Sequence, residues 1–528
     1  MRVTNSMIMN NSKSDINNTK VNLDSTNHTM TTGKKISRPS DDPVVAIRSL
    51  RYATSMNHMD QYLNKNIEDA DSWLDVTETA LSNIYSSVND MHTLADQGAN
   101  GTNTSSDLNT ILSSLENLQK SVYYEGNADY AGRTIFTGYR TNSSLTFLED
   151  DSDLTYNIQE PLTYKDMSQM RYYDGEVTIP TDPADITSST IDADDYETSE
   201  TLFNRIRLSY KETDDIATGD IRIIPTTDTK SGVTAGTVIE PVVTSYDSLE
   251  EWEAAGANGK EVADDEIVYI KETGELIIGT TLSDEISTGH ANLEVNYTKT
   301  GFSEGELRPE HYFNCTVNPG ATDEVYYSKY ELDDSGELKY NSNNEPIRIQ
   351  YDINYIVANN QTLTVNTEAC EVFDCDIKRD IDDMIDAVKW ALECTDKVSK
   401  IESMMGEAQY ASEESQANLQ TLLDAAEKEE TYARDNLQKL FESEITKSND
   451  YLSQINLAIT NVGNKGDSLD LTKTRVSSQY ETIEELKSAN EDVDLSSAMI
   501  DYSAAYVSYQ AALTAASKVG QQTLLNYI

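Results

Sequence analysis

A thin apolar stripe runs through the first thirty residues of the chain. Its members recur at every seventh position, at Met9, Ile16, Leu23 and Met30. This interval places the side chains on one face of a helix, as in a coiled coil. With so narrow a stripe the helix needs an apolar partner, because isolated helices are marginally stable in water.

A stronger pattern follows this stripe. Over residues 56–95 the apolar positions are spaced by three and four, which predicts a long amphipathic helix. Gly98 and Gly101 interrupt the pattern, and a second stripe over residues 108–122 predicts another helix.

The middle of the chain loses the helical period. Residues 133–148 change to β-branched and aromatic residues around Gly138, which predicts a hairpin. Residues 150–370 are rich in Thr, Tyr, Val, Asp and Gly, and residues 267–278 show two apolar runs flanking a turn. This zone is therefore predicted to be β-rich.

The helical period returns over residues 377–405 and 437–462. A last stripe includes Leu495, Met499, Tyr502, Tyr506, Tyr509, Leu513 and Ala516. Its heptad register indicates a packing surface with the tyrosine hydroxyls at the rim, in preference to a platform for a ligand.

These patterns predict an α+β fold: an elongated, multi-domain chain in which the N- and C-terminal helices form a coiled-coil-like bundle and a β-rich outer domain is inserted between them. Either the other terminus or another subunit would cover each terminal stripe. The predicted segments are an N-terminal helix (1–42), the first half of a helical core with a hairpin (43–149), the inserted domain (150–370), the second half of the core (371–489) and a C-terminal helix (490–528).

The charge of the chain argues against nucleic acid and membrane surfaces as partners. The formal net charge is -52, and so negative a surface repels phosphate groups. Residues 1–52 differ, with eight Lys or Arg against four Asp. No apolar run is long enough for a membrane span, and the N-terminus lacks a secretory signal pattern. A soluble protein is expected, and any export would use a route without a cleavable signal peptide.

No cofactor, metal or catalytic site is expected from the sequence. The five histidines lack ligand spacing, and the four cysteines include only one close pair, Cys370 and Cys375, so buried or free thiols are expected. An acidic run over residues 374–386 could attract Ca²⁺ but lacks the glycine-centred loop of a dedicated site, and carboxylates also suit a helix start.

One motif could indicate an enzyme in the inserted domain. Residues 301–305 match G-x-S-x-G around Ser303, but Pro309 follows where a nucleophile elbow needs a helix, so a turn is the favoured interpretation. An enzyme or a glycan-binding adhesin within residues 150–370 is the less favoured alternative.

The segment GKKISRPSDDP (33–43) predicts a hinge between two helices. Gly33 suits the left-handed residue that ends a helix, and Pro39 keeps Arg38 out of the helical region. Asp42 before Pro43 matches an N-cap followed by proline at the first helical position. The predicted hinge residues are Gly33, Arg38, Pro39, Asp41, Asp42 and Pro43.

Several separate stretches, in order, resemble one family. They are TTGKKISRPSDDPVVA (31–46), QGANGT (97–102), GRTIFTGYRTN (132–142) and the C-terminal segment 490–528. Together they resemble the flagellar hook-filament junction proteins, the hook-associated protein 3 family of the bacterial flagellin superfamily. The arginine-proline-serine form of the joint favours a junction protein over flagellin, the filament subunit, which is the alternative.

The resemblance implies a structural adaptor for motility, without enzymatic activity. Such a protein is exported unfolded by the flagellar type III apparatus, with an export chaperone, and is located outside the cell in the flagellum. It self-associates in a ring between a hook-associated protein 1 type subunit below and flagellin above. The predicted subunit-packing residues are Met9, Ile16, Leu23, Met30, Leu495, Met499, Tyr502, Tyr506, Tyr509 and Leu513.

Overall fold

The structure is a computed structural model that describes residues 5–180, 183–187, 199–230, 232–256, 260–334 and 336–521. The chain forms two compact units. The first contains residues 1–71, 354–363 and 466–528, and the second contains residues 72–353 and 364–465. Both units thus join parts of the chain that are far apart in sequence.

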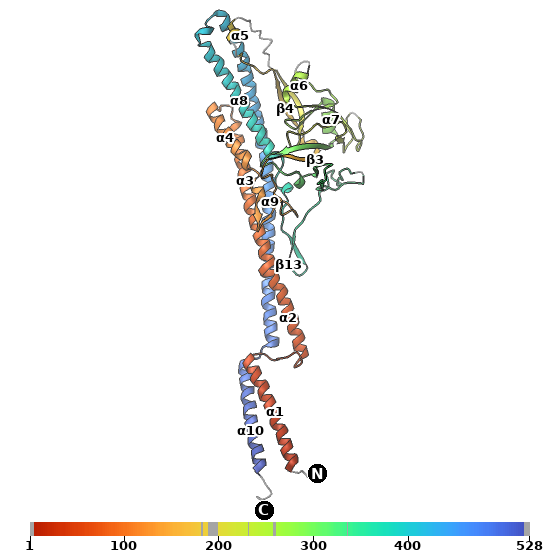
Figure 1. Ribbon diagram of the computed structural model, residues 1–528, viewed down its shortest axis with the longest axis vertical. Coiled ribbons are helices and arrows are strands. Elements are labelled where there is room, and N and C mark those ends of the chain that lie inside the picture. The colour runs from red at the N-terminus through yellow and green to blue at the C-terminus, as the bar shows by residue number, and fades with distance from the viewer. Residues whose placement is uncertain are drawn as a thin grey trace, which may run out of the picture. The chain divides into compact units, whose positions relative to one another are not determined.

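The first unit is mainly helical. It contains α1 (Asn5–Thr32), α2 (Pro43–Gln61), a π-helical turn (Tyr62–Ile67), the start of α3 (Glu68–Gly98), the end of α9 (Glu413–Glu491) and α10 (Leu495–Gln521). Figure 1 shows α1 and α10 side by side, with the start of α1 and the end of α10 at the same end of the pair. Each terminal helix therefore packs along one side against the other terminus, which was one of the two partners that the sequence left open.

A small hairpin belongs to the same unit. Its strands are β13 (Asn354–Ala358) and β14 (Gln361–Thr364). The Asn66 amide donates to the carbonyl of Ile356 at 2.7 Å, and the Gln361 amide donates to the Thr472 hydroxyl at 3.1 Å. These bonds attach the hairpin to the helices.

The helices of the second unit share a core. They are α3, α4 (Ser105–Ser121), α8 (Asp376–Met405) and the first part of α9. The predicted stripe of α3 is buried, with Leu81, Ile84 and Val88 fully enclosed. Gly98 lets α3 lie close to α9, because a Cβ at this position would overlap the ring of Phe441 on α9.

Two five-stranded sheets form the β-rich part of this unit. One has the order β12-β11-β3-β10-β6 and the other β4-β5-β9-β8-β7. The bounds are β3 (Asp151–Thr163), β4 (Ser168–Asp174), β5 (Ser199–Arg207), β6 (Ile221–Ile224), β7 (Val242–Tyr246), β8 (Glu266–Ile270), β9 (Glu275–Ile278), β10 (Asn292–Phe302), β11 (Asn314–Val317) and β12 (Val325–Tyr327).

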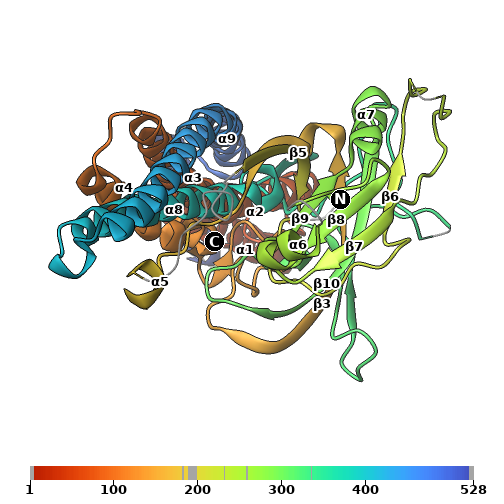
Figure 2. The same ribbon diagram turned by 90° about the horizontal axis from the view of Figure 1, so that it is seen from above.

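Pairing in these sheets is antiparallel except between β7 and β8. The hairpin predicted at 267–278 is confirmed, with Ile267 opposite Ile278 and Gly274 at a positive φ of 65° in the turn. Short helices α5 (Pro183–Thr187), α6 (Leu249–Ala255) and α7 (Thr280–Thr288) complete the unit. Figure 2 shows α6 and α7 beside the strands, and Trp252 of α6 packs on Val268 and Ile277.

The hairpin predicted over residues 133–148 was wrong in position, because the observed hairpin lies over residues 129–134. Two-residue strands β1 (Asp129–Tyr130) and β2 (Arg133–Thr134) pair across a turn at Gly132, and Gly138 lies in a separate turn. Residues 135–148 do not form a second strand, because Phe136 and Phe147 are each buried, with Phe136 packed edge-on against Phe373.

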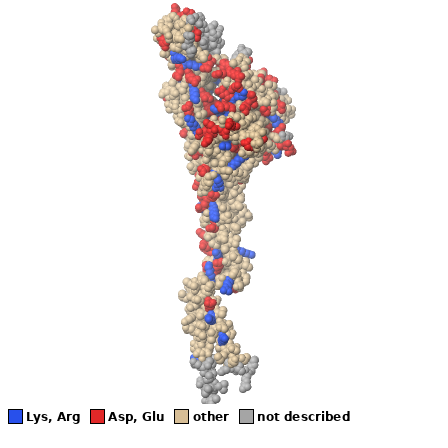
Figure 3. All heavy atoms as spheres, viewed as in Figure 1, with Lys and Arg blue, Asp and Glu red and all other residues tan. Residues whose placement is uncertain are grey.

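Charge is distributed unevenly over the molecule. Figure 3 shows carboxylates densely placed over the β-rich part and sparse on α1 and α10. All four cysteines are free thiols, and burial raises the pKa of Cys375 well above its usual value. None of the helices in the described part of the chain combines the length and hydropathy that a membrane span requires.

Candidate functional site: terminal helices, hinge and buried charges

The contact between α1 and α10 follows a heptad on both helices. On α1 the half-buried residues that keep a heptad register are Ser12, Ile16, Thr19, Leu23, Thr26 and Met30, and Thr29 beside Met30 is half-buried as well. On α10 they are Ala498, Tyr502, Ala505, Tyr509, Ala512 and Ala516. Both sets alternate spacings of four and three, as in a two-helix coiled coil. We call these residues the terminal seam.

Only some of the predicted subunit-packing residues belong to the terminal seam. Ile16, Leu23, Met30, Tyr502 and Tyr509 lie in it and are half-buried. The sequence pattern included Ala516 in the last stripe. It did not indicate Ser12, Thr19 and Thr26, because hydroxyl side chains do not add to an apolar stripe, nor Ala498, Ala505 and Ala512, because small residues carry a weak signal.

The other predicted packing residues remain exposed. On α10 the exposed fraction is 57% for Leu495 and Met499, 45% for Tyr506 and 42% for Leu513. On α1, Met9 is 58% exposed. The ring of Tyr502, which lies in the terminal seam, stacks on the ring of the exposed Tyr506 with centroids 6.3 Å apart. The exposed residues are therefore directly next to the terminal seam. We call Leu495, Met499, Tyr506 and Leu513 the open face of α10.

Two chain connections pass each other at the predicted hinge. Gly33 has a φ of 70°, and its amide donates to the carbonyl of Thr29 at 2.9 Å, which ends α1. The Gly33 carbonyl accepts from the amide of Val493 at 2.9 Å, and the Lys35 amide donates to the carbonyl of Glu491 at 2.7 Å. The segment after α1 is therefore paired with the segment between α9 and α10.

Side chains reinforce this pairing. The Lys34 ammonium lies 2.5 Å from an Asp492 oxygen and 3.3 Å from a Glu491 oxygen. The hydrogen bond with Asp492 raises the pKa of Lys34, and the same bond lowers the pKa of Asp492. The Asn490 amide also donates to the carbonyl of Val45 at 3.0 Å, which connects the end of α9 to α2.

The two aspartates of the hinge have different roles. A carboxylate oxygen of Asp41 accepts from the amide of Arg38 at 2.8 Å, closing a turn in which Arg38 and Pro39 are exposed. Asp42 caps α2, since its carboxylate accepts from the amides of Val44 and Val45 and Pro43 occupies the first turn. This local geometry agrees with the sequence interpretation; that the segment acts as a hinge stays a prediction.

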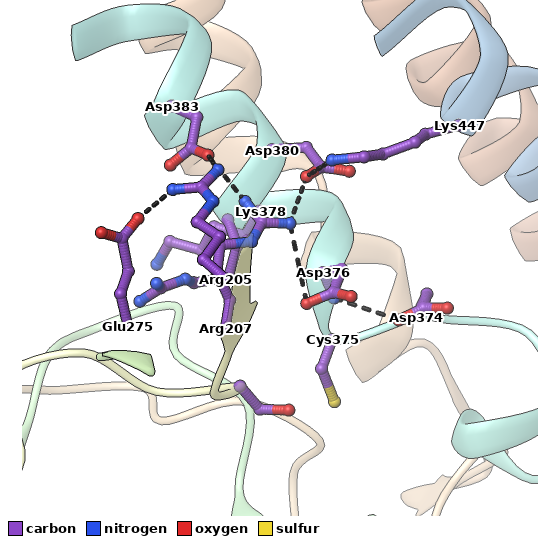
Figure 4. A network of polar contacts seen from close by, with 12 residues as sticks. Arg205, Arg207, Glu275, Asp374, Cys375, Asp376, Lys378, Asp380, Asp383 and Lys447 are labelled. Carbon is purple, nitrogen blue, oxygen red and sulfur yellow. Dashed lines mark hydrogen bonds and ion pairs between the residues drawn. The ribbon is translucent and has the colours of Figure 1, made fainter. Parts of the chain in front are cut away.

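A buried charge network connects the β-rich part of the second unit to its helices (Figure 4). Arg205 and Arg207 project from the same face of β5, because they are two positions apart on a strand. The Arg205 guanidinium contacts Asp383 of α8 at 2.7 Å and also binds Glu275 of β9. Arg207 contacts Asp383 at 2.9 Å and binds Asp380.

Helix α9 completes the network. The Lys447 ammonium and the Tyr451 hydroxyl each donate to Asp380, at 2.8 and 2.7 Å. Burial opposes the charged form of Asp380, yet Arg207 and Lys447 hold its pKa below the usual value. Glu444 accepts from Lys447 at 2.8 Å, but burial and the nearby Asp380 raise its pKa to about 8.

The network explains the acidic run at 374–386. Asp376, Asp380, Asp382 and Asp383 all pair with cations from elsewhere in the fold. Only Asp374 and Asp376 are at the helix start, so the interaction with the helix dipole accounts for little of the run. Within the described residues, no three His, Cys, Asp or Glu are grouped so as to hold a metal ion.

Ser303 lies in a turn, as the sequence indicated. Strand β10 ends at Phe302, Gly305 has a φ of 81°, and a short 3-10 helix begins only at Pro309. Ser303 is at the edge of a cavity of about 560 Å³, whose described lining includes no histidine. This is not the strand-turn-helix arrangement of a nucleophile elbow.

The N-terminal part of the chain matches a known family. The family model for the bacterial flagellin N-terminal helical region covers residues 3–141, which include α1, the hinge segment and α2 to α4. Residues 3–141 are therefore similar to the N-terminal helical region of bacterial flagellins.

Among individual proteins the similarity is to hook-associated protein 3, which confirms the resemblance drawn from the sequence motifs. The chain is 25% identical over 145 residues to flagellar hook-associated protein 3 of Salmonella typhimurium. The match covers 27% of this chain and 45% of that relative, so it spans less than half the relative's length.

Solved structures of flagellar hook-associated proteins resemble the chain at low sequence identity. One is assigned as a flagellar hook-associated protein of Vibrio parahaemolyticus, with 13% identity, a TM-score of 0.34, and coverage of 86% of this chain and 100% of that one. Hook-associated protein 3 of Legionella pneumophila shows 9% identity, a TM-score of 0.29, and coverage of 82% and 96%. With TM-scores below 0.5, these likenesses do not bear on function.

Proposed function

We propose that this protein is a structural adaptor of the bacterial flagellum, located outside the cell between the hook and the filament. The open face of α10 is the observation that carries the proposal. Four large apolar side chains stay exposed there although α1 covers the adjacent seam. The flagellin-type N-terminal region supports the flagellar setting.

The open face suits packing against other subunits. Burying a large apolar side chain contributes about 1.5–3 kcal/mol, so a repeated contact through four such residues would hold a ring of subunits together. In this proposal the ring contacts a hook-associated protein 1 type subunit on one side and flagellin on the other. A flagellar export chaperone would bind the chain before assembly.

The proposed role requires no catalysis. The strand-turn-helix arrangement of a nucleophile elbow is not present around Ser303, and Arg205, Arg207 and Lys447 are each paired with a carboxylate of α8. The network then has a mechanical role: it fixes the β-rich part to helices α8 and α9.

Deletion of the gene followed by electron microscopy of the cells tests the proposal. Hooks without filaments, with flagellin released into the medium, are expected, and a plasmid copy should restore filaments. Normal filaments on the deletion strain would contradict the adaptor role. If purified protein added to filament seeds grows long filaments, the protein is a flagellin instead.

A further inference from the structure

A cleft in the second unit has no role in the proposed assembly. Its volume is about 380 Å³, within the range of small-molecule sites. It lies between strand β4, helix α6 and the facing sides of α8 and α9. On α8 it is lined by Asp386, Trp390 and Glu393, and on α9 by Tyr432 and Asn436. These spacings of three and four place each set on one helix face.

Aromatic rings form one wall of the cleft. The Tyr173 ring lies 4.6 Å from the Trp390 ring and 5.6 Å from the Tyr432 ring, centroid to centroid. All three residues are only half-buried, and the Lys428 ammonium lies 5.6 Å from the centroid of the Tyr432 ring, so a ligand would stack on Trp390 and not on Tyr432. Aromatic faces attract cations through the negative potential of the ring.

The charged residues of the cleft are mostly acidic. Nine carboxylates line it, against three cations, Arg171, Arg205 and Lys260. Each cation is already paired: Arg171 with Glu200, Arg205 with Asp383, and Lys260 with Asp174.

Three of the nine carboxylates differ from the others in their ion pairing. Glu250, Asp386 and Glu393 form no ion pair with any residue that the structure describes. All three are exposed to solvent, and Asp386 also faces Lys211 and Lys389, which favour its charged form. A cation that enters the cleft from solvent can therefore reach these carboxylates.

A buried amide also belongs to the cleft. Asn436 is 8% exposed and lines the cavity, yet its side chain has no hydrogen-bond partner within the described part of the chain. Buried amides are normally hydrogen-bonded, so this one is free to bind a ligand. It is an observation independent of the acidic residues.

We propose that this cleft binds a small organic cation with an ammonium or guanidinium head group. The head group stacks on Trp390 and hydrogen-bonds to Asp386 and Glu393, and the Asn436 carbonyl accepts from it. A planar guanidinium combines stacking and paired hydrogen bonds better than an ammonium does, so it is expected to bind more tightly.

Tryptophan fluorescence provides a direct test with the full-length protein. Of the three tryptophans only Trp390 is among the residues that line the cleft, whereas Trp73 and Trp252 are buried, at 0% and 1% exposure, so Trp390 is expected to give the main response to a ligand. Titration with agmatine, against sodium chloride of equal ionic strength, should change the emission saturably below about 50 mM. Butylamine should bind more weakly, and the neutral 1,4-butanediol and glucose should not bind.

A charge-removing variant checks the site. The double variant Asp386→Asn and Glu393→Gln should weaken agmatine binding about tenfold, measured by calorimetry. The matched control is Asp396→Asn with Glu402→Gln, two exposed acids of the same helix that do not line the cleft and should leave the affinity unchanged. Circular dichroism confirms that both variants are folded.

Three results would overturn the proposal. They are the absence of a saturable response to agmatine, equal responses to agmatine and butanediol, and an affinity unchanged by the double variant. Binding of glucose without binding of either amine would assign the cleft to a sugar instead.

Discussion

Lys34 and Asp492 are separated by 458 positions in sequence, yet their charged groups lie 2.5 Å apart. The pair sits where the connection after α1 runs antiparallel to the connection before α10. The terminal helices are thus joined to each other through their connections as well as through the terminal seam.

The Lys34–Asp492 pair should stabilise this crossing only modestly. Both side chains are partly exposed, so a double-mutant cycle with Lys34→Ala and Asp492→Ala should give a coupling below about 1 kcal/mol. The pKa of Asp492 is lowered, so the stability that the pair provides is lost as the pH falls below about 4. The pKa of Lys34 is raised, so the same stability is lost above about pH 10.

Hydrogen exchange of the Lys35 and Val493 amides measures that coupling locally, since both amides donate across the crossing. Lys20→Ala on the exposed side of α1 is the control and should leave their protection unchanged. Equal protection at pH 3 and pH 7 would show that the pair contributes nothing.

Substitution of Gly33 should reveal the cost of its backbone conformation. Its φ of 70° is unfavourable for most residues, whereas a Cβ there would meet no atom within 4 Å. Gly33→Val should therefore destabilise the end of α1 by about 1–2 kcal/mol, and Gly33→Asn by less, because asparagine tolerates this region. The rate of proteolysis within residues 33–42 ranks the variants, and a ranking with asparagine worst would contradict the argument.

Removing Asp380 should strongly destabilise the second unit. Asp380 is 0% exposed and accepts from both Lys447 and Tyr451 while it pairs with Arg207. Asp380→Asn removes the carboxylate that Arg207 and Lys447 share, so that Arg207 keeps Asp383 and Lys447 keeps Glu444. Breaking a buried pair typically costs roughly 3–5 kcal/mol, which is the upper bound expected here. Urea unfolding followed by circular dichroism measures the loss. Asp396→Asn on the same helix should change stability by less than about 0.5 kcal/mol.

Glu444→Gln should change how stability depends on pH. The pKa of Glu444 is raised to about 8 from an ordinary 4.5, so the folded state keeps a proton that the unfolded chain has lost. Between these values the wild type loses stability with rising pH, by up to roughly 1.4 kcal/mol per unit, and the glutamine variant lacks this loss. The variant should therefore be more stable than the wild type at pH 9 and similar at pH 5. Parallel stability curves from urea unfolding would count against the raised pKa.

Charges on the open face of α10 should block assembly without unfolding the protein. Tyr506→Asp combined with Leu513→Asp places carboxylates where subunit contacts are proposed, so cells with this variant should carry hooks without filaments. Ala504→Asp combined with Ser508→Asp is the matched control, because these exposed residues lie on the opposite side of the helix from Tyr506. Normal filaments from the first variant would exclude the open face as an interface.

Much of the fold could be predicted from local patterns. The stripes of α3, α4 and α8, the hairpin of β8 and β9, and the caps at Gly33 and Asp42 depend on residues close in sequence. The displaced hairpin near Gly138 was wrong in position because Phe136 and Phe147 are taken into the core, and a local pattern does not show which distant surface will bury an aromatic ring.

By itself the sequence determined the two helical ends, the β-rich insertion and the similarity of the N-terminal part to flagellin-type helical regions, because periodicity and motif order are local properties of the chain. Only the tertiary structure decided which side of α10 meets α1. The alanines pack closely in the terminal seam and leave the larger residues exposed. The tertiary structure also decided that the acids of α8 pair with Arg205, Arg207 and Lys447. Such long-range contacts depend on packing geometry that no short stretch of sequence contains.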